Sequence, residues 1–211
     1  VDIPLTELGE AQARAAGELL RASAGSIDAI VASPLLRTRR TAEIVREFGR
    51  LDVDVADFVI DERLREKEFG VLDRYTVAGI RATFPDLAEQ RSLVGKFYFR
   101  PPGGESWCDV ILRLRSVVEV LRRDHVGDRV LIVGHQVIVN CFRYLLECMD
   151  EKQILDIDRQ NDVPNCSVTE YAIERDRPDA RFELQVANFA LPLEEAGEPV
   201  TADADVPVGP R

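Results

Sequence analysis

Two short apolar runs, far apart in the chain, decide what kind of sheet this sequence can build. Residues 29–32 read Ala-Ile-Val-Ala, and residues 130–133 read Val-Leu-Ile-Val. An apolar run without polar alternation is typical of a strand that is covered on both faces of a parallel sheet. Residues 109–123 repeat apolar side chains at helical spacing. Helices alternating with buried strands predict an α/β fold, a three-layer α/β/α sandwich with a mostly parallel sheet.

Further elements follow from caps and periodicity. Thr6 is typical of a helix N-cap, and Ser33-Pro34 favours the start of another helix. A segment of mixed charge from 61 to 100 predicts less regular structure. The other expected elements are helices at 6–20, 33–48, 77–84 and 136–148, and strands at 53–59, 168–174 and 182–187.

The length of 211 residues suits a single domain. We expect the domain to occupy residues 1–190. Residues 191–211 are rich in Pro, Glu, Asp, Ala and Gly, which predicts a disordered acidic tail.

The charge balance restricts the partners. With 38 acidic against 27 basic residues, the net charge is −11. Such a field repels nucleic acid and anionic membranes, so we expect neither as a partner. No apolar run reaches the length of a membrane span. An anionic substrate would need its own local group of Arg and Lys side chains.

The four cysteines, Cys108, Cys141, Cys148 and Cys166, show no metal-ligand spacing. We expect reduced thiols in a cytoplasmic protein, with no metal and no cofactor.

His135 is the first candidate for chemistry. It comes directly after the apolar run 130–133 and before a predicted helix. Ligands in open α/β sheets bind at this carboxyl edge, where the N–H groups of a helix start favour an anion. Alternatively, His135 only satisfies a hydrogen bond near the sheet edge. The second histidine, His125, lies in a charged turn and is interpreted as surface.

Arg37 is the second candidate, because it follows the other apolar run at the same edge of the predicted sheet. A guanidinium binds phosphate oxygens through two parallel hydrogen bonds. Taken alone, an arginine here is also compatible with a surface salt bridge. Lys96, Tyr98 and Arg100 alternate and would share a face if that stretch were extended. They are candidates for the positive charge that an anionic substrate needs.

Four stretches together carry a resemblance. They are Ser-Pro-Leu-Leu-Arg-Thr at 33–38, Leu-Arg-Glu-Lys-Glu-Phe-Gly at 64–70, Pro-Gly-Gly-Glu-Ser at 102–106 and Val-Gly-His-Gln at 133–136. In this order and spacing the chain resembles the histidine phosphatase family, the phosphoglycerate-mutase-like enzymes, from Pro4 to about Val186. The spacing of charges alone does not separate Glu66 from Glu68. The resemblance points to Glu66, which stands four residues before Gly70.

The resemblance implies a mechanism. The family's Arg-His-Gly motif, which holds the nucleophilic histidine, is absent from the 211 residues, and Val1 falls at about the point just after it. We therefore expect that motif, and the first central strand of the sheet, upstream of this chain. Glu66 would act as general acid and base, while Arg37 and His135 would hold phosphoryl oxygens, with Gly134 and Gln136 beside them.

The substrate stays open at this point. Residues 96–106 and Gln136 look like the fructose-2,6-bisphosphatase branch, but that branch has an arginine where this chain has Asn140. We expect a phosphomonoester hydrolase acting on a small phosphorylated metabolite through a phosphohistidine, and we expect the 211 residues alone to be inactive. The alternatives are a phosphotransferase of the phosphoglycerate mutase type and an inactive relative that binds phosphate or protein. The oligomeric state is not predicted.

Overall fold

A three-stranded parallel sheet lies at the centre of the computed structural model, which describes residues 3–23, 25–160, 163–173 and 181–189. Its order is β2 (Phe58–Ile60), β1 (Ala29–Ala32), β3 (Val130–Val133). Ala32 pairs with Val133 at the carboxyl end of the register. The α/β class and the parallel sheet predicted from the two apolar runs are confirmed. The predicted tail, 191–211, lies outside the described residues.

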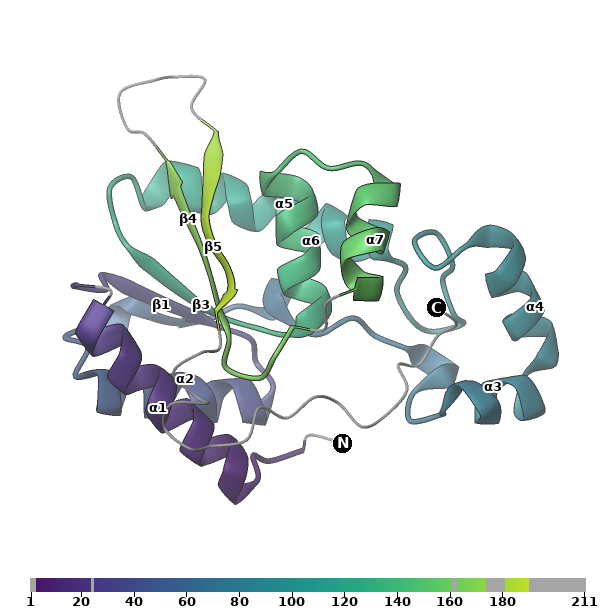
Figure 1. The fold of residues 1–211 in the computed structure, drawn as a ribbon, viewed down its shortest axis with the longest axis horizontal. Helices are drawn as coiled ribbons and strands as arrows, with labels where there is room; N and C mark the ends of the chain where they lie inside the picture. Colours follow the sequence, from purple (N-terminus) through teal and green to yellow (C-terminus); the bar gives the residue numbers. More distant parts are fainter. Residues whose placement is uncertain (1–2, 24, 161–162, 174–180, 190–211) are drawn as a thin grey trace.

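Helices cover both faces of this sheet, as Figure 1 shows. Ile30 and Ala32 pack into one apolar cluster with α1 (Glu7–Ser23) and α2 (Leu36–Gly49). Val31 points the other way, into a cluster with α5 (Trp107–Asp124) and α6 (Gln136–Leu146). Successive side chains of a strand face opposite sides of the sheet, so one apolar strand supplies both cores. This arrangement gives the three predicted layers.

A strand pair and a helix complete this body. Strands β4 (Val168–Ile173) and β5 (Phe182–Phe189) form an antiparallel pair, close to the predicted bounds. Helix α7 (Glu151–Gln160), which the sequence analysis missed, packs beside α6 through the fully buried Ile154.

The segment between β2 and α5 forms a separate lobe at the side of the sheet (Figure 1). It contains the 3₁₀ turns η2 (Glu62–Leu64) and η3 (Gly70–Leu72) and the helices α3 (Val77–Thr83) and α4 (Pro85–Val94). A small core of Leu72, Ile80 and Phe99 holds it together. The predicted helix near 77–84 is confirmed, while α4 was not foreseen.

Two local predictions are wrong. Helix α2 begins at Leu36 and not at Ser33; the Thr38 hydroxyl donates to the carbonyls of Ser33 and Leu35, holding a turn ahead of the helix. The expected strand 53–59 begins instead with a 3₁₀ turn, η1 (Val55–Asp57). The condition set for Lys96, Tyr98 and Arg100 to share a face is not met, because the Phe99 N–H donates to the Gly95 carbonyl and closes a turn.

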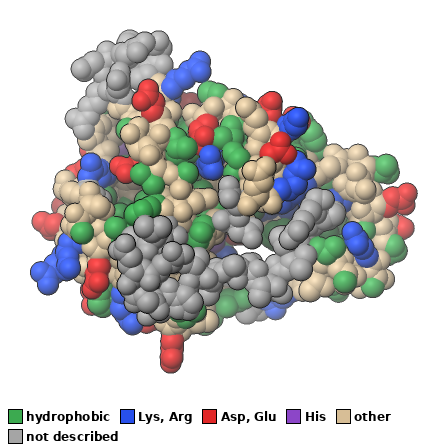
Figure 2. Space-filling view, viewed as in Figure 1, with side chains coloured by type: hydrophobic (Ala, Val, Ile, Leu, Met, Phe, Trp, Pro, Cys, Tyr) green, Lys and Arg blue, Asp and Glu red, His purple; other side chains and the backbone are tan. Residues whose placement is uncertain are grey.

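The helix caps agree with the sequence. The Gly9 N–H donates to the Thr6 hydroxyl, and Ser106 forms a full capping box with Asp109 at the start of α5. On the face drawn in Figure 2, acidic and basic side chains are interspersed rather than gathered in one patch. Within the described residues, no helix combines the length and the apolar character that a membrane crossing requires.

Candidate active site

The carboxyl ends of β1 and β3 bring three polar side chains together. Ser33 follows β1 and His135 follows β3, and the Ser33 N–H donates to the Val133 carbonyl at 3.0 Å. His135 Nε2 lies 2.8 Å from Ser33 Oγ, and His135 Nδ1 lies 3.1 Å from Arg37 Nη2. The two residues singled out at separate strand ends are therefore in direct contact, at the edge where the sequence placed them.

These contacts fix the state of the imidazole. A guanidinium can only donate, so His135 Nδ1 must accept, and its other nitrogen then donates to the Ser33 hydroxyl. The ring is neutral in this arrangement. Burial, together with the positive charges of Arg37 and Arg113, lowers the pKa of His135 to about 3.

Glu66 lies in the loop between η2 and η3, and its carboxyl group reaches the same site. It accepts a hydrogen bond from the Lys67 N–H at 2.7 Å and a second from the Val137 N–H in the first turn of α6. Desolvation raises the pKa of Glu66, while these amides and the charges of Arg37 and Arg113 act in the opposite direction. The structure thus places an acid that holds its proton more firmly than usual beside Arg37.

Gly134 and Gln136 flank His135 at the junction of β3 and α6. A Cβ on Gly134 would meet only Ile138 Cγ2 at 3.4 Å, an ordinary contact, so packing alone does not require glycine there. The binding roles expected for Gly134 and Gln136 stay predictions.

The three candidates from residues 96–100 have acidic partners on helices. Lys96 pairs with Asp158 of α7, and Tyr98 donates to Glu151 at the start of the same helix. Arg100 is exposed and pairs with Asp109 of α5. Lys96 also interacts electrostatically with Lys67, next to Glu66. Their role in substrate binding stays a prediction.

Sequence reasoning missed two buried cations, Lys67, which follows Glu66 in the chain, and Arg91, whose charge acts on Lys67. Lys67 is 6% exposed and stacks its amine on the Phe69 ring, 4.4 Å from the centroid. Burial and the charge of Arg91 lower the pKa of Lys67 to about 8. Arg91 of α4 is 8% exposed, and its Nε and Nη2 have no hydrogen-bond partner. The mixed charges around Lys67 suggested only a solvated segment, and α4 itself was not predicted.

Asn140 stands where the bisphosphatase-like branch has arginine, and it is fully buried. Its Nδ2 lies 3.4 Å from Asp158, the partner of Lys96, while its Oδ1 has no hydrogen-bond partner. The substitution therefore leaves a neutral donor next to that ion pair.

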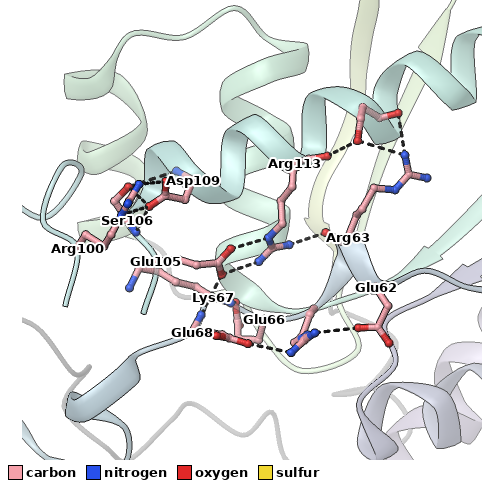
Figure 3. Close-up of polar contacts among 12 residues, drawn as sticks. Glu62, Arg63, Glu66, Lys67, Glu68, Arg100, Glu105, Ser106, Asp109 and Arg113 are labelled. Atoms are coloured by element: carbon pink, nitrogen blue, oxygen red, sulfur yellow. Dashed lines mark hydrogen bonds and ion pairs between the residues drawn. The ribbon is translucent and has the colours of Figure 1, made fainter. Parts of the chain in front are cut away.

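A second missed feature is an ion pair behind the Glu66 loop. Arg113 of α5 binds Glu105 through Nε at 2.9 Å and Nη2 at 3.0 Å, as Figure 3 shows. In the sequence, the stretch 102–106 was used only for the family resemblance, and Arg113 was not singled out. Within the described ranges, no group of His, Cys, Asp and Glu side chains could hold a metal ion.

Comparison with known sequences places this geometry in a family. Residues 1–183 match the histidine phosphatase superfamily (branch 1). The chain is 36% identical over 140 residues to a probable phosphoglycerate mutase, GpmB, of Photorhabdus laumondii, a match that covers 66% of this chain and 61% of that protein. It is 31% identical over 166 residues to the 2,3-bisphosphoglycerate-dependent phosphoglycerate mutase of Methylobacterium radiotolerans, covering 77% of this chain and 76% of the relative. The match thus spans less than two thirds of the Photorhabdus protein.

Solved structures agree. Bacillus stearothermophilus YhfR superposes with a TM-score of 0.72 at 31% identity, covering 89% of this chain and 86% of that one. A mycobacterial glucosyl-3-phosphoglycerate phosphatase complexed with VO3 gives 0.70 at 30% identity, covering 89% and 88%. Phosphatases and mutases are therefore both among the relatives, and the solved phosphatase shares this fold. With its parallel sheet and the arginine and histidine meeting at the strand ends, this chain belongs to the histidine phosphatase superfamily.

Proposed function

We propose that the protein is a phosphomonoester hydrolase in which Arg37 and His135 bind the phosphoryl group and Glu66 handles the proton. One observation carries this proposal: Arg37, in the first turn of α2, and His135, after β3, meet at 3.1 Å at the carboxyl edge of the sheet, and the charge of Arg37 acts on the carboxyl group of Glu66. A bound phosphoryl group would lie against the Arg37 guanidinium and the first turn of α6. His135 would donate to it by exchanging one of its present hydrogen bonds, to Ser33 or Arg37, for a phosphoryl oxygen.

The proposed reaction has two steps. A nucleophilic histidine attacks phosphorus, the P–O bond to the alcohol breaks, and Glu66 gives its proton to the departing oxygen. Water then attacks the phosphohistidine while Glu66 takes a proton from it, which releases phosphate and frees the histidine. The raised pKa of Glu66 suits the first step, because the carboxyl group must be protonated when the alcohol leaves.

The nucleophile is not assigned to either histidine of the 211 residues. His135 already uses both ring nitrogens, on Ser33 and Arg37, and His125 pairs with Asp128 in a surface turn. The proposal needs a histidine supplied by the complete protein, in the family's Arg-His-Gly motif. For this reason every activity experiment below uses the full-length gene product.

The substrate we propose carries a second anionic group besides the phosphate. Arg91 has buried donors without partners, and it lies within electrostatic reach of Lys67, the buried amine next to Glu66 in the sequence. Burying such donors unpaired is costly, and a carboxylate or phosphate would satisfy them. The names of the relatives agree, since phosphoglycerate and glucosyl-3-phosphoglycerate both bear a carboxylate and a phosphate.

Assaying a panel of phosphomonoesters tests the proposal. We expect the complete protein to release phosphate from 3-phosphoglycerate faster than from glycerol phosphate. Arg91→Met should reduce that preference by about tenfold, the worth of one charged hydrogen bond. If the folded protein binds phosphate but releases none from any ester, the alternative is favoured, namely that the protein is an inactive member of the family that only binds phosphate or protein.

The mutase relatives support a second candidate function. A mutase would convert 3-phosphoglycerate to 2-phosphoglycerate without net release of phosphate. Following both products in one reaction separates the two functions, because isomerisation in excess of phosphate release would assign the protein to the mutases.

A further inference from the structure

We infer that Arg113 and Glu105 are positioning residues for Glu66. The inference rests on the proposed function. Neither side chain is expected to touch the substrate; together they fix the loop that carries the acid.

The loop has little structure of its own. Residues 65–69 lie between two short 3₁₀ turns, η2 and η3, and make no strand pairing. A carboxyl group on such a loop would move relative to a substrate bound at the strand ends. A misplacement of about 1 Å can cost a catalytic group roughly 100-fold in rate, so the loop needs an external anchor.

The ion pair supplies anchors on both sides of Glu66, as Figure 3 shows. Ahead of it, Arg113 Nη1 donates to the Arg63 carbonyl. Behind it, the Glu68 N–H donates to Glu105 Oε2 at 3.1 Å, and the Glu105 N–H donates to the Glu68 carbonyl at 2.9 Å. Because Arg113 grips Glu105 with its other two nitrogens, one guanidinium connects both ends of the loop to the rigid helix α5.

The Arg113–Glu105 ion pair is suited to holding the Glu66 loop, and we expect it to add little to the stability of the fold as a whole. Side chains of Arg113 and Glu105 are 19% and 22% exposed, enough screening to limit the worth of a simple ion pair. All three guanidinium nitrogens are used, and two carboxylate oxygens are used. Such a fork cannot be reproduced by lysine, which offers one point of charge.

Arg113 also acts on the acid through its charge. The groups that face the Glu66 carboxyl group are Arg37 of α2, Arg113 of α5, Lys67 of the loop and Cys141 of α6, with the N–H groups of Lys67 and Val137. Arg113 lowers the pKa of Glu66, so removing its charge should raise that pKa. Lysine at 113 keeps the charge but loses the fork, which separates the two effects.

The test compares two leaving groups in the complete protein. The glycerol of glycerol phosphate would leave as an unstable alkoxide, so it needs a proton from Glu66. The leaving group of p-nitrophenyl phosphate is a stabilised phenolate, which can leave without that proton. The quantity measured is kcat/KM, which reports the first phosphoryl transfer and excludes the later hydrolysis step. Glu66→Gln sets the benchmark, with a loss of about 100-fold or more for glycerol phosphate and a much smaller loss for p-nitrophenyl phosphate.

Three variants then probe the pair. Arg113→Lys and Glu105→Gln should each lose roughly tenfold to 100-fold on glycerol phosphate and less than about threefold on p-nitrophenyl phosphate. Arg113→Met should show the same split, and its Glu66 carboxyl group, followed by 13C NMR titration, should have a higher pKa than in Arg113→Lys. Arg123→Met, which removes an exposed arginine at the end of the same helix, is the matched control and should change neither rate.

Equal losses on both substrates in Arg113→Lys and Glu105→Gln, or no loss on either, would overturn the inference, because a role in folding alone cannot distinguish leaving groups. Should Arg113→Met fail to fold, the two milder variants decide. A folded wild-type protein that hydrolyses neither substrate contradicts the proposed function instead, and the NMR titration then still reports whether Arg113 faces Glu66.

Discussion

The two halves of the candidate site are built in different ways. His135 follows β3 and Arg37 lies in the first turn of α2, after β1, so the pairing of β1 with β3 brings the two to one edge of the sheet. Glu66 stands on a loop in the side lobe, held by an ion pair and by two glycines at a close backbone contact. The first half follows from the central sheet, and the second depends on a few individual side chains. Mutation of Arg37 at the sheet edge should therefore affect substrate binding and catalysis. Mutation of the glycines that hold the Glu66 loop should affect stability.

The largest effect should come from Arg37→Ala. Losing the guanidinium removes the donor that we propose for the phosphoryl oxygens, and we expect kcat/KM of the complete protein to fall roughly 1000-fold, about 4 kcal/mol. The melting temperature should change little, since Arg37 is only partly buried. Arg39→Ala, an exposed neighbour on α2, is the control. A loss of less than tenfold would show that the strand ends do not bind the phosphoryl group.

The next largest effect should come from Gly70→Ala, which should lower the stability of the protein. Gly70 has φ +55°, and an added Cβ would lie 2.2 Å from the Pro102 carbonyl oxygen and 2.6 Å from the Gly104 nitrogen. We expect a loss of about 3 kcal/mol in urea unfolding. Gly95→Ala is the matched control, because Gly95 also has positive φ but open space around it, and it should lose about 1 kcal/mol. Equal losses would mean that the contact with the 101–105 turn is loose.

The pH dependence of stability should reveal His135. Its pKa lies at about 3 in the folded protein against 6.5 for the free side chain, so the unfolded chain binds the extra proton first. Stability is then complete above pH 6.5 and falls as the pH drops from 6.5 toward 3, by at most about 1.4 kcal/mol per pH unit from this residue. Urea unfolding of the wild type and of His135→Gln at several pH values in this range tests this prediction. The unfolding free energy of the variant should fall less steeply with decreasing pH. His125→Gln measures the contribution of the other histidine.

The smallest effect should come from the cap of α5. Ser106→Ala removes the hydroxyl that accepts from the Asp109 N–H, and we expect a loss of about 1 kcal/mol in unfolding free energy. Because the cap lies beside the Glu105 anchor but outside it, the ratio of rates for the two leaving groups should not change. A changed ratio would extend the positioning unit to the helix start.

The sequence predicted the first half of the site and only part of the second. Apolar runs at 29–32 and 130–133 identify strands by composition alone, and the residues that follow them necessarily share an edge. Glu66 was found through family resemblance, since its charged neighbours give no local signal. Arg113 and Glu105 were missed because an ion pair between a turn and a helix leaves no periodic pattern.

The side lobe escaped prediction for a related reason. Helix α4 begins at a proline and shows little amphipathic pattern, and its Arg91 is buried through tertiary packing against Phe99. Propensity cannot anticipate such burial, because it depends on which residues fold back over the helix. The turn at 95–99 similarly overrode the alternation that suggested an extended Lys96–Arg100 segment.

The Lys67 amine, which stacks on Phe69, should make substrate binding sensitive to alkaline pH. The chain contains three lysines, and its remaining basic residues are arginines, which keep their protons at any working pH. With a pKa of about 8, Lys67 is the cation near Glu66 that titrates first as base is added. Affinity for a doubly charged metabolite should therefore decline above this point while the guanidinium contacts persist. A single ammonium group would then set the upper pH limit of substrate capture.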